Sequence, residues 1–371
     1  MKRTLSTLLL FLSFFAKAQT SDYYLLVGTY TGGKSTGIYV YKFNTEKIAF
    51  TYQSDVKSEN PSYLTVTKNQ RFVYAVNENG EHKGAVSAFS FDKEDGKLSF
   101  LNTQLTEGDH PCYITVDSSG KNVIATNYSS GNLAVFKTNS DGSLNPISQN
   151  IIHQGKSVVA DRQEKAHAHS ANFTPDGKFV LAADLGNDQL YQYKFDPWNK
   201  EVLSPAIPSF YKIPAGSGPR HFEFHPNKKY CYLLNELSGK VTVYSWSNNK
   251  LTAIQSITSD TTAGVGNKGS ADIHVAPNGK FLYTSNRATA NDITIYKIVT
   301  DGKLSMVEHV KVGLHPRNFM IDPSGRLLLV ANRDSNNIQV FKIDPNSGKL
   351  ENTNETISVD KPVCLKMIPT K

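Results

Sequence analysis

Short apolar runs alternate with clusters of Gly, Asn, Asp and Pro along most of the chain. The runs are rich in Val, Ile, Tyr and Phe, and no long stretch keeps a helical period. Short β-branched and aromatic runs bounded by turn residues are typical of β-strands. The pattern therefore predicts an all-β protein.

One unit of this pattern recurs six times, for example as "NPSYLTVTKNQRFVYAVNE" from Asn60 and "HPRNFMIDPSGRLLLVANR" from His315. Each unit reads as a strand, a tight turn of the "PDGK" kind and a second strand that ends on a polar residue. The polar residues are Asn77, Asn127, Asp184, Asn235, Asn286 and Asn332, at steps of 50, 57, 51, 51 and 46 residues. Such a period in an all-β chain predicts a propeller with one four-stranded blade per repeat.

The two chain ends supply the halves of one more unit. "YYLLVGTYTGG" at residues 23–33 resembles a second strand without its first, and "KPVCLKMIP" at 361–369 resembles a first strand without its second. Pairing residues 24–30 with 362–368 would close the ring and leave no open sheet edge. We therefore expect a single seven-bladed β-propeller over residues 19–371.

The first residues, "MKRTLSTLLLFLSFFAKAQ", have the form of a secretory signal. Lys2 and Arg3 precede an apolar segment at residues 4–15, which is short for a bilayer span. Ala16-Lys17-Ala18 matches the small-x-small cleavage pattern. Residues 1–18 are therefore expected to be removed, leaving a periplasmic or secreted protein without a membrane anchor.

The charge of the chain bears on its partners, and its cysteine content bears on disulfide bonds. The formal charge is only +7, and no Lys/Arg run interleaves with aromatic residues, so a nucleic-acid partner is not expected. Three cysteines, Cys112, Cys231 and Cys364, lie inside apolar runs. An odd, sparse set is no disulfide framework, and we expect buried free thiols in a monomeric protein.

Aligning the units on their turns places chemically reactive residues in register. The first strand of a blade lies innermost, and its start meets the end of the second strand at the same mouth of the channel. The inner column holds Ser62, Cys112, His169, Arg220, Ala271, Arg317 and Val363. The column after the closing polar residue holds Glu78, Tyr128, Leu185, Glu236, Arg287, Arg333 and, in the split blade, Tyr30. Charges that converge on a narrow channel need partners or a ligand.

Three chemical roles are possible for these residues: a metal site, a serine triad and general acid–base catalysis. His167 and His169 could bind a metal with Glu236, but Arg220 and Arg287 would repel the ion, so no metal site and no cofactor is expected. Ser170 follows His169 directly and would face the other way along a strand, which disfavours a serine triad. General acid–base chemistry suits His169 and Glu236, with arginines that bind an anion.

The chain also resembles a known family over most of its length, roughly residues 22–369. The resemblance rests on "LLVGTYTGGKSTGIYVYKF", "HSANFTPDGKFVLAADLGNDQLYQYKF", "GPRHFEFHPNKKYCYLLNEL" and "ANRDSNNIQVFKID". These segments are similar to the lactonase family of seven-bladed propellers, which includes bacterial 6-phosphogluconolactonases and the fungal 3-carboxy-cis,cis-muconate lactonizing enzyme. The His, Arg, Glu and Arg proposed for the muconate enzyme match His169, Arg220, Glu236 and Arg287.

The resemblance implies hydrolysis of an anionic sugar lactone, 6-phospho-D-glucono-1,5-lactone or a related aldonolactone. Two alternatives remain open at this point: a lactonizing enzyme or cycloisomerase with the same site, and a non-catalytic propeller that binds carbohydrate or protein. The expected catalytic residues are His169, Glu236, Arg220 and Arg287. The expected substrate-binding residues are Tyr30, Glu78, Tyr128, His167, Arg317 and Arg333.

Overall fold

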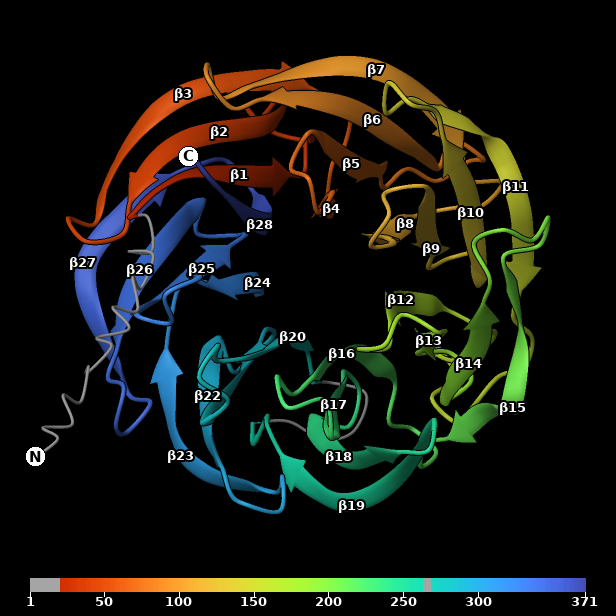
Figure 1. The fold of residues 1–371 in the computed structure, drawn as a ribbon. Coiled ribbons are helices and arrows are strands. Elements are labelled where there is room, and N and C mark those ends of the chain that lie inside the picture. The colour runs from red at the N-terminus through yellow and green to blue at the C-terminus, as the bar shows by residue number, and fades with distance from the viewer. Residues whose placement is uncertain (1–20, 263, 265–267) are drawn as a thin grey trace, which may run out of the picture.

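Seven four-stranded antiparallel sheets are arranged around a common axis in the computed structural model (Figure 1). The structure describes residues 21–262, 264 and 268–371, so the expected signal segment at residues 1–18 lies outside it. The sheets confirm the all-β fold and the seven blades that the repeat predicts.

Each blade runs from an inner strand to an outer strand. The inner strands are β28 (Pro362–Pro369), β4 (Leu64–Val66), β8 (Pro111–Val116), β12 (Ala168–Phe173), β16 (Pro219–Phe224), β20 (Ser270–Val275) and β24 (Pro316–Ile321). The second strands are β1 (Asp22–Thr29), β5 (Phe72–Asn77), β9 (Asn122–Asn127), β13 (Phe179–Asp184), β17 (Tyr230–Asn235), β21 (Phe281–Asn286) and β25 (Leu327–Asn332). The third strands are β2 (Gly37–Asn44), β6 (Ala85–Asp92), β10 (Asn132–Thr138), β14 (Gln189–Phe195), β18 (Lys240–Ser247), β22 (Asp292–Ile298) and β26 (Asn337–Ile343). The outer strands are β3 (Ala49–Lys57), β7 (Lys97–Leu105), β11 (Leu144–Ile152), β15 (Leu203–Lys212), β19 (Lys250–Thr258), β23 (Leu304–Lys311) and β27 (Leu350–Ser358).

The two ends of the chain close the ring, as the two half-units predict. Strand β28 pairs antiparallel with β1, from Tyr23 opposite Pro369 to Thr29 opposite Pro362. The blade that contains both ends has the order β28-β1-β2-β3. Every blade therefore has a neighbour on both sides, and apolar side chains fill the space between them.

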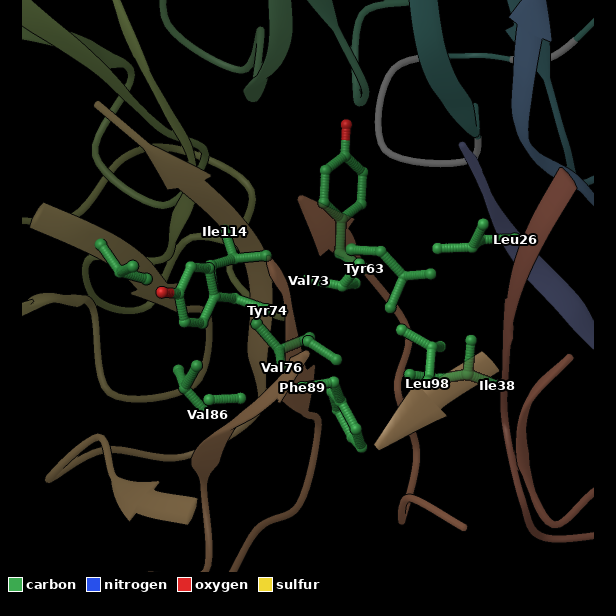
Figure 2. Close-up of a cluster of buried hydrophobic side chains, with 14 of the residues drawn as sticks. Leu26, Ile38, Tyr63, Val73, Tyr74, Val76, Val86, Phe89, Leu98 and Ile114 are labelled. Atoms are coloured by element: carbon green, nitrogen blue, oxygen red, sulfur yellow. The ribbon is translucent and has the colours of Figure 1, made fainter. Parts of the chain in front are cut away.

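The largest apolar cluster shows how neighbouring blades pack. It joins Leu26 and Ile38 of the closing blade to Tyr74 and Phe89 of the next blade and to Ile114 of the third (Figure 2). All five side chains are fully or almost fully buried. Strands β5, β9 and β21 are buried along nearly their whole length, whereas the outer strand β7 has one buried position among exposed and half-buried ones. The core thus lies between blades rather than within one.

A repeated hydrogen bond ties adjacent blades at their outer turns. The hydroxyl of Tyr74 on β5 donates to the carbonyl of Gly142 in the next blade at 3.0 Å. Tyr232 makes the same contact with Gly302, and Tyr283 with Gly348. Because each tyrosine ring is buried between blades, its hydroxyl needs such a partner.

All three cysteines are free and buried, which confirms the interpretation as buried thiols. Within the described part of the chain, no helix has the length and apolar character required to cross a membrane.

Removing β28 should open the ring. Deleting residues 362–371 removes the fully buried Val363, Cys364, Leu365 and Ile368 and exposes the edge of β1. Since each buried apolar side chain contributes about 1.5–3 kcal/mol, we expect the melting temperature to fall by more than about 10 °C. Differential scanning calorimetry would measure it, with deletion of Thr370 and Lys371 alone as the control. A melting temperature within a degree or two of the full chain would contradict closure by this strand.

Candidate active site

The inner-column residues sit in β-bulges at the start of the inner strands. In β12 the register moves from Ala168 opposite Asp184 to Ser170 opposite Ala183, which leaves His169 without a strand partner. In β16 the same shift leaves out Arg220. Corresponding shifts in other blades leave out Cys112, Arg317 and Val363. A bulge re-aims a side chain, and here it is repeated around the channel.

These bulges border a cavity of about 270 Å³ at the mouth that both columns share. The lining residues are Glu78, Cys112, Tyr128, Arg162, His169, Glu236, Arg287 and Arg317. All of them except Arg162 stand in the two columns, and six of these seven are expected site residues, the seventh being Cys112. The cavity therefore assembles side chains from widely separated repeats, as the alignment predicts.

The carboxylate of Glu236 is the electrostatic centre of the cavity. Its Oε2 accepts a hydrogen bond from Arg220 Nε at 2.9 Å and lies 2.9 Å from Arg287 Nη2 in an ion pair. Its Oε1 accepts one from Arg162 Nη2 at 2.7 Å. Burial acts to raise the pKa of Glu236, but Arg287, Arg220 and Arg162 outweigh it and hold the pKa well below its usual range. Glu236 is therefore ionised at neutral pH and is a weak base.

Arg220 lies behind this carboxylate. Its side chain is 1% exposed, and its Nη1 donates to the backbone carbonyl of Ala271 in the next blade. Arg287 lies nearer the cavity and anchors its Nε on the carbonyl of Gly269 at 2.9 Å. Burial, only partly opposed by Glu236, lowers the pKa of Arg287 to about 10, so it remains charged at neutral pH.

A second charged group lines the other side of the cavity. The hydroxyl of Tyr30 donates to Glu78 Oε2 at 2.9 Å, and Arg317 Nη2 lies 3.5 Å from the same oxygen. The Arg317 guanidinium also lies 5.5 Å from the centre of the Tyr30 ring. Tyr30 thus reaches the site through Glu78 rather than through the cavity wall.

His169 is buried at the floor of the cavity. Its ring lies 5.5 Å from the ring of Tyr128 and 5.3 Å from that of His221, edge to face in both cases. Burial, and then the charge of Arg220, lower the pKa of His169 well below its usual range. The imidazole is therefore neutral at neutral pH and can accept a proton.

The neighbouring thiol is a poor nucleophile. Cys112 Sγ lies 3.7 Å from His169 Nδ1. Burial, and then the nearby carboxylate of Glu78, raise the pKa of Cys112 to about 12. Because the thiolate is the reactive form, this thiol is inert at neutral pH.

His167 and His169 have different surroundings: only His169 lies in the bulge and lines the cavity. Nδ1 of His167 lies 2.9 Å from the carbonyl of Tyr128, and its Nε2 lies 3.1 Å from Glu164 Oε1. The ring stacks on Tyr128 with 4.5 Å between centres. His167 therefore supports Tyr128 from behind. Among the described residues, no three His, Cys, Asp or Glu side chains form a metal-binding group.

Two further features lie away from the cavity wall. Arg333 makes a bidentate ion pair with its exposed neighbour Asp334, at 2.7 and 3.0 Å. The stretch "GKSTG" at residues 33–37 has the letters of a G-x-S-x-G motif. Its Ser35 Oγ, however, lies 2.5 Å from Thr29 Oγ1 and outside the cavity, so the motif supplies no nucleophile there.

Arg162 lines the cavity but belongs to neither column. It lies in the connection from β11 to β12, residues 153–167, which is the longest link between an outer strand and the next inner strand. The signal in the sequence is the 57-residue step between Asn127 and Asp184, the largest of the five. A residue in an insertion has no counterpart in the other repeats, so an alignment of repeats does not reveal it.

A polar network below the cavity was also not anticipated. His221 Nδ1 lies 2.8 Å from Asp272 Oδ1, and His274 Nε2 lies 3.2 Å from Asp272 Oδ2. His274 Nδ1 in turn lies 2.7 Å from Glu223 Oε2. Burial alone would lower the pKa of His274, but Asp272 and Glu223 raise it to about 10, whereas burial and Arg220 lower that of His221 to about 4. The network holds a charged His274 beneath a neutral His221.

Comparison with known proteins places this geometry in a family. A model of the lactonase family, described as a 7-bladed β-propeller, matches residues 24–367. The chain belongs to this lactonase family. A 6-phosphogluconolactonase from Bacillus subtilis is 37% identical over 348 residues, which cover 92% of this chain and 97% of that protein.

Solved structures of lactonase propellers agree with this assignment. A crystal structure from Bacteroides fragilis is 44% identical with a TM-score of 0.91, and covers 94% of this chain and 98% of that one. The structure of a periplasmic gluconolactonase from Pseudomonas aeruginosa is 36% identical with a TM-score of 0.90, covering 95% of this chain and all of that one. The lactonase fold is thus shared along almost the whole chain.

Removing the carboxylate of Glu236 should destabilise the protein. Glu236→Ala would leave buried arginines without their counter-charge, and breaking a buried ion pair from one side costs about 3–5 kcal/mol. We expect the urea midpoint at pH 7 to fall clearly, whereas the exposed control Glu351→Ala should leave it unchanged.

The stability lost in Glu236→Ala should also depend on pH. The pKa of Glu236 is lower in the folded protein than its unfolded value of about 4.3, so its stabilisation is complete above that pH and is lost as the pH falls further. Urea titrations at several pH values should show wild type and Glu236→Ala converging in acid. Equal midpoints for Glu236→Ala and Glu351→Ala at pH 7 would disprove the central role of this carboxylate.

Proposed function

We propose that the protein hydrolyses a sugar lactone in the manner of a 6-phosphogluconolactonase, opening 6-phospho-D-glucono-1,5-lactone or a related aldonolactone to the acid. The observation that carries the proposal is the charge of the site: Arg162, Arg287 and Arg317 line the cavity against only two carboxylates, and Arg220 adjoins it. Such an excess of cations favours an anionic ligand. The name of the Bacillus subtilis relative supports the reaction class.

Ring opening needs a base for water, charge stabilisation at the carbonyl and an acid for the leaving oxygen. Neutral His169 takes a proton from water as the oxygen attacks the lactone carbonyl. Arg287 stabilises the negative charge that develops on the carbonyl oxygen. As the ester bond breaks, the ring oxygen takes the proton back from His169. One water is consumed, and a hydroxy acid is formed.

Glu236 acts differently in this scheme from His169. Both carboxylate oxygens already accept hydrogen bonds from arginines, which leaves them less free to take a proton from water. Glu236 therefore orients Arg287 and Arg220, and His169 transfers the proton. All of these residues come from one chain, so we expect a monomer to be active.

A pH-stat screen of the purified protein against sugar lactones, phosphorylated and not, tests this function. We expect acid release with at least one aldonolactone. With a muconate we expect no change, whereas a lactonizing enzyme would convert it to a lactone and take up one proton per turnover, which the pH-stat would record as acid consumption. A protein that binds sugar acids but opens no lactone would instead support the non-catalytic alternative.

His169→Ala and His167→Ala form a matched pair on one strand. Loss of a general acid–base residue costs about a hundredfold or more in turnover, and we expect that loss for His169→Ala but less than about tenfold for His167→Ala. Since the pKa of His169 is below about 6.5, kcat/KM should also hold steady as the pH falls from 7 toward 6.5. Equal losses in both variants, restored by added zinc, would support a metal site instead.

We also propose that residues 1–18 direct export, so that the enzyme acts outside the cytoplasm. The relative from Pseudomonas aeruginosa is named as periplasmic, which supports this location. Mass spectrometry of the protein isolated from its native host should find a mature chain beginning at or near Gln19. Soluble cytoplasmic protein that retains Met1 would argue against export.

A further inference from the structure

Four arginines serve the cavity, and they differ in their depth. The side chain of Arg220 is 1% exposed, that of Arg287 10%, and that of Arg317 14%. The side chain of Arg162 is 32% exposed. Arg162 is also the one that precedes an inner strand, at the mouth where the inner strands begin. It therefore stands at the entrance, while His169 lies on the floor.

The connection that carries Arg162 is held in place by buried contacts. His153 lies between Asp184 Oδ2, at 2.7 Å, and the Tyr193 hydroxyl, at 2.9 Å. The fully buried Gln163, next to Arg162, donates from Nε2 to the carbonyl of Leu185 at 2.8 Å. The backbone N–H groups of Arg162 and Gln163 also donate to the carbonyl of Val159, at 3.0 and 2.7 Å. The connection is therefore anchored at its start and beside Arg162, which keeps this residue at the cavity.

The guanidinium of Arg162 has binding capacity left for a ligand. Its Nη2 donates to Glu236 Oε1 at 2.7 Å and to the Tyr128 hydroxyl at 3.3 Å. A guanidinium has five N–H donors in a planar fork that suits phosphoryl and carboxylate groups. Glu236 keeps Arg220 and Arg287 as partners even if Arg162 turns toward a ligand.

The size of the cavity orients the substrate. About 270 Å³ is small for a ligand site, since such sites usually have about 300–1,000 Å³. A sugar lactone whose carbonyl reaches His169 would fill this space with its ring. A charged substituent beyond the ring would then lie at the entrance, beside Arg162.

We propose that Arg162 binds an ionised substituent of the substrate outside the lactone ring, and so determines the preference for charged over neutral sugar lactones. This inference rests on the proposed function for its substrate class. A phosphoryl ester and a second carboxylate share the chemistry that Arg162 recognises. The test therefore contains a probe for each of them.

The binding test uses open-chain acids as probes, so it does not depend on turnover. Isothermal titration calorimetry would compare 6-phosphogluconate, glucarate and gluconate on wild type, Arg162→Gln and Arg162→Lys. 6-Phosphogluconate and glucarate each carry two ionised groups, whereas gluconate carries one. Since a charge-assisted hydrogen bond is strong, wild type should bind at least one of the first two acids about tenfold or more tightly than gluconate. Arg162→Gln should abolish that preference and change the affinity for gluconate by less than about threefold. Arg162→Lys should keep part of the preference. The tighter of the two doubly ionised probes identifies the substituent.

Exposed Arg326, in the turn between β24 and β25, supplies a control; Arg326→Gln should keep the preference. Three outcomes would overturn the proposal. The preference could survive in Arg162→Gln, it could be absent in wild type, or Arg162→Gln could lose the same affinity for all three acids. Lactone turnover is measured in parallel. If wild type opens no lactone yet shows the Arg162-dependent preference, the proposed function fails while the binding role of Arg162 stands.

Discussion

A propeller has to close, and in this protein the hydrogen bonds between β28 and β1 join the two ends of the chain to close it. Once these strands pair, every blade packs against two neighbours, and apolar clusters such as that of Leu26, Tyr74 and Ile114 extend across blade boundaries. Closure also brings the starts of all inner strands to one mouth. The cavity depends on this constraint, because Arg317, Glu78 and Glu236 come from different blades and meet only in a closed ring.

Within that ring, the bulges and the buried charges work together. Regular strand pairing would set the direction of the side chains of His169 and Arg220. A bulge at each of these residues directs them toward the channel instead. The arginines around the cavity would repel one another without Glu236, whose two oxygens lie within 2.9 Å of a guanidinium nitrogen of three of them. Burial, and then the positive charge of Arg220, lower the pKa of His169 and keep its imidazole neutral. A neutral base and charged anion-binding groups therefore coexist because they are buried next to each other.

The site is also organised in layers along the channel. Arg162 stands at the entrance, Arg287 lies in the wall and His169 lies on the floor. Beneath them, the ring of His221 contacts the ring of His169, and Asp272 in turn contacts His221. In the proposed reaction, this order separates the group that would bind a charged substituent from the group that would transfer the proton. It also explains why His167, which stacks behind Tyr128, contributes support rather than a lining surface.

The sequence by itself determined the blade count, the ring closure and six of the eight cavity-lining residues, because a repeat places equivalent residues at equivalent heights. It did not reveal that Arg333 pairs with Asp334 outside the cavity, since a column gives height in the channel but not the direction of a side chain. Nor did it reveal Arg162, whose insertion has no equivalent in other repeats. That the pKa of Glu236 lies well below its usual range was decided by the tertiary structure alone, because a pKa depends on burial and on distances between charges that only the closed ring sets.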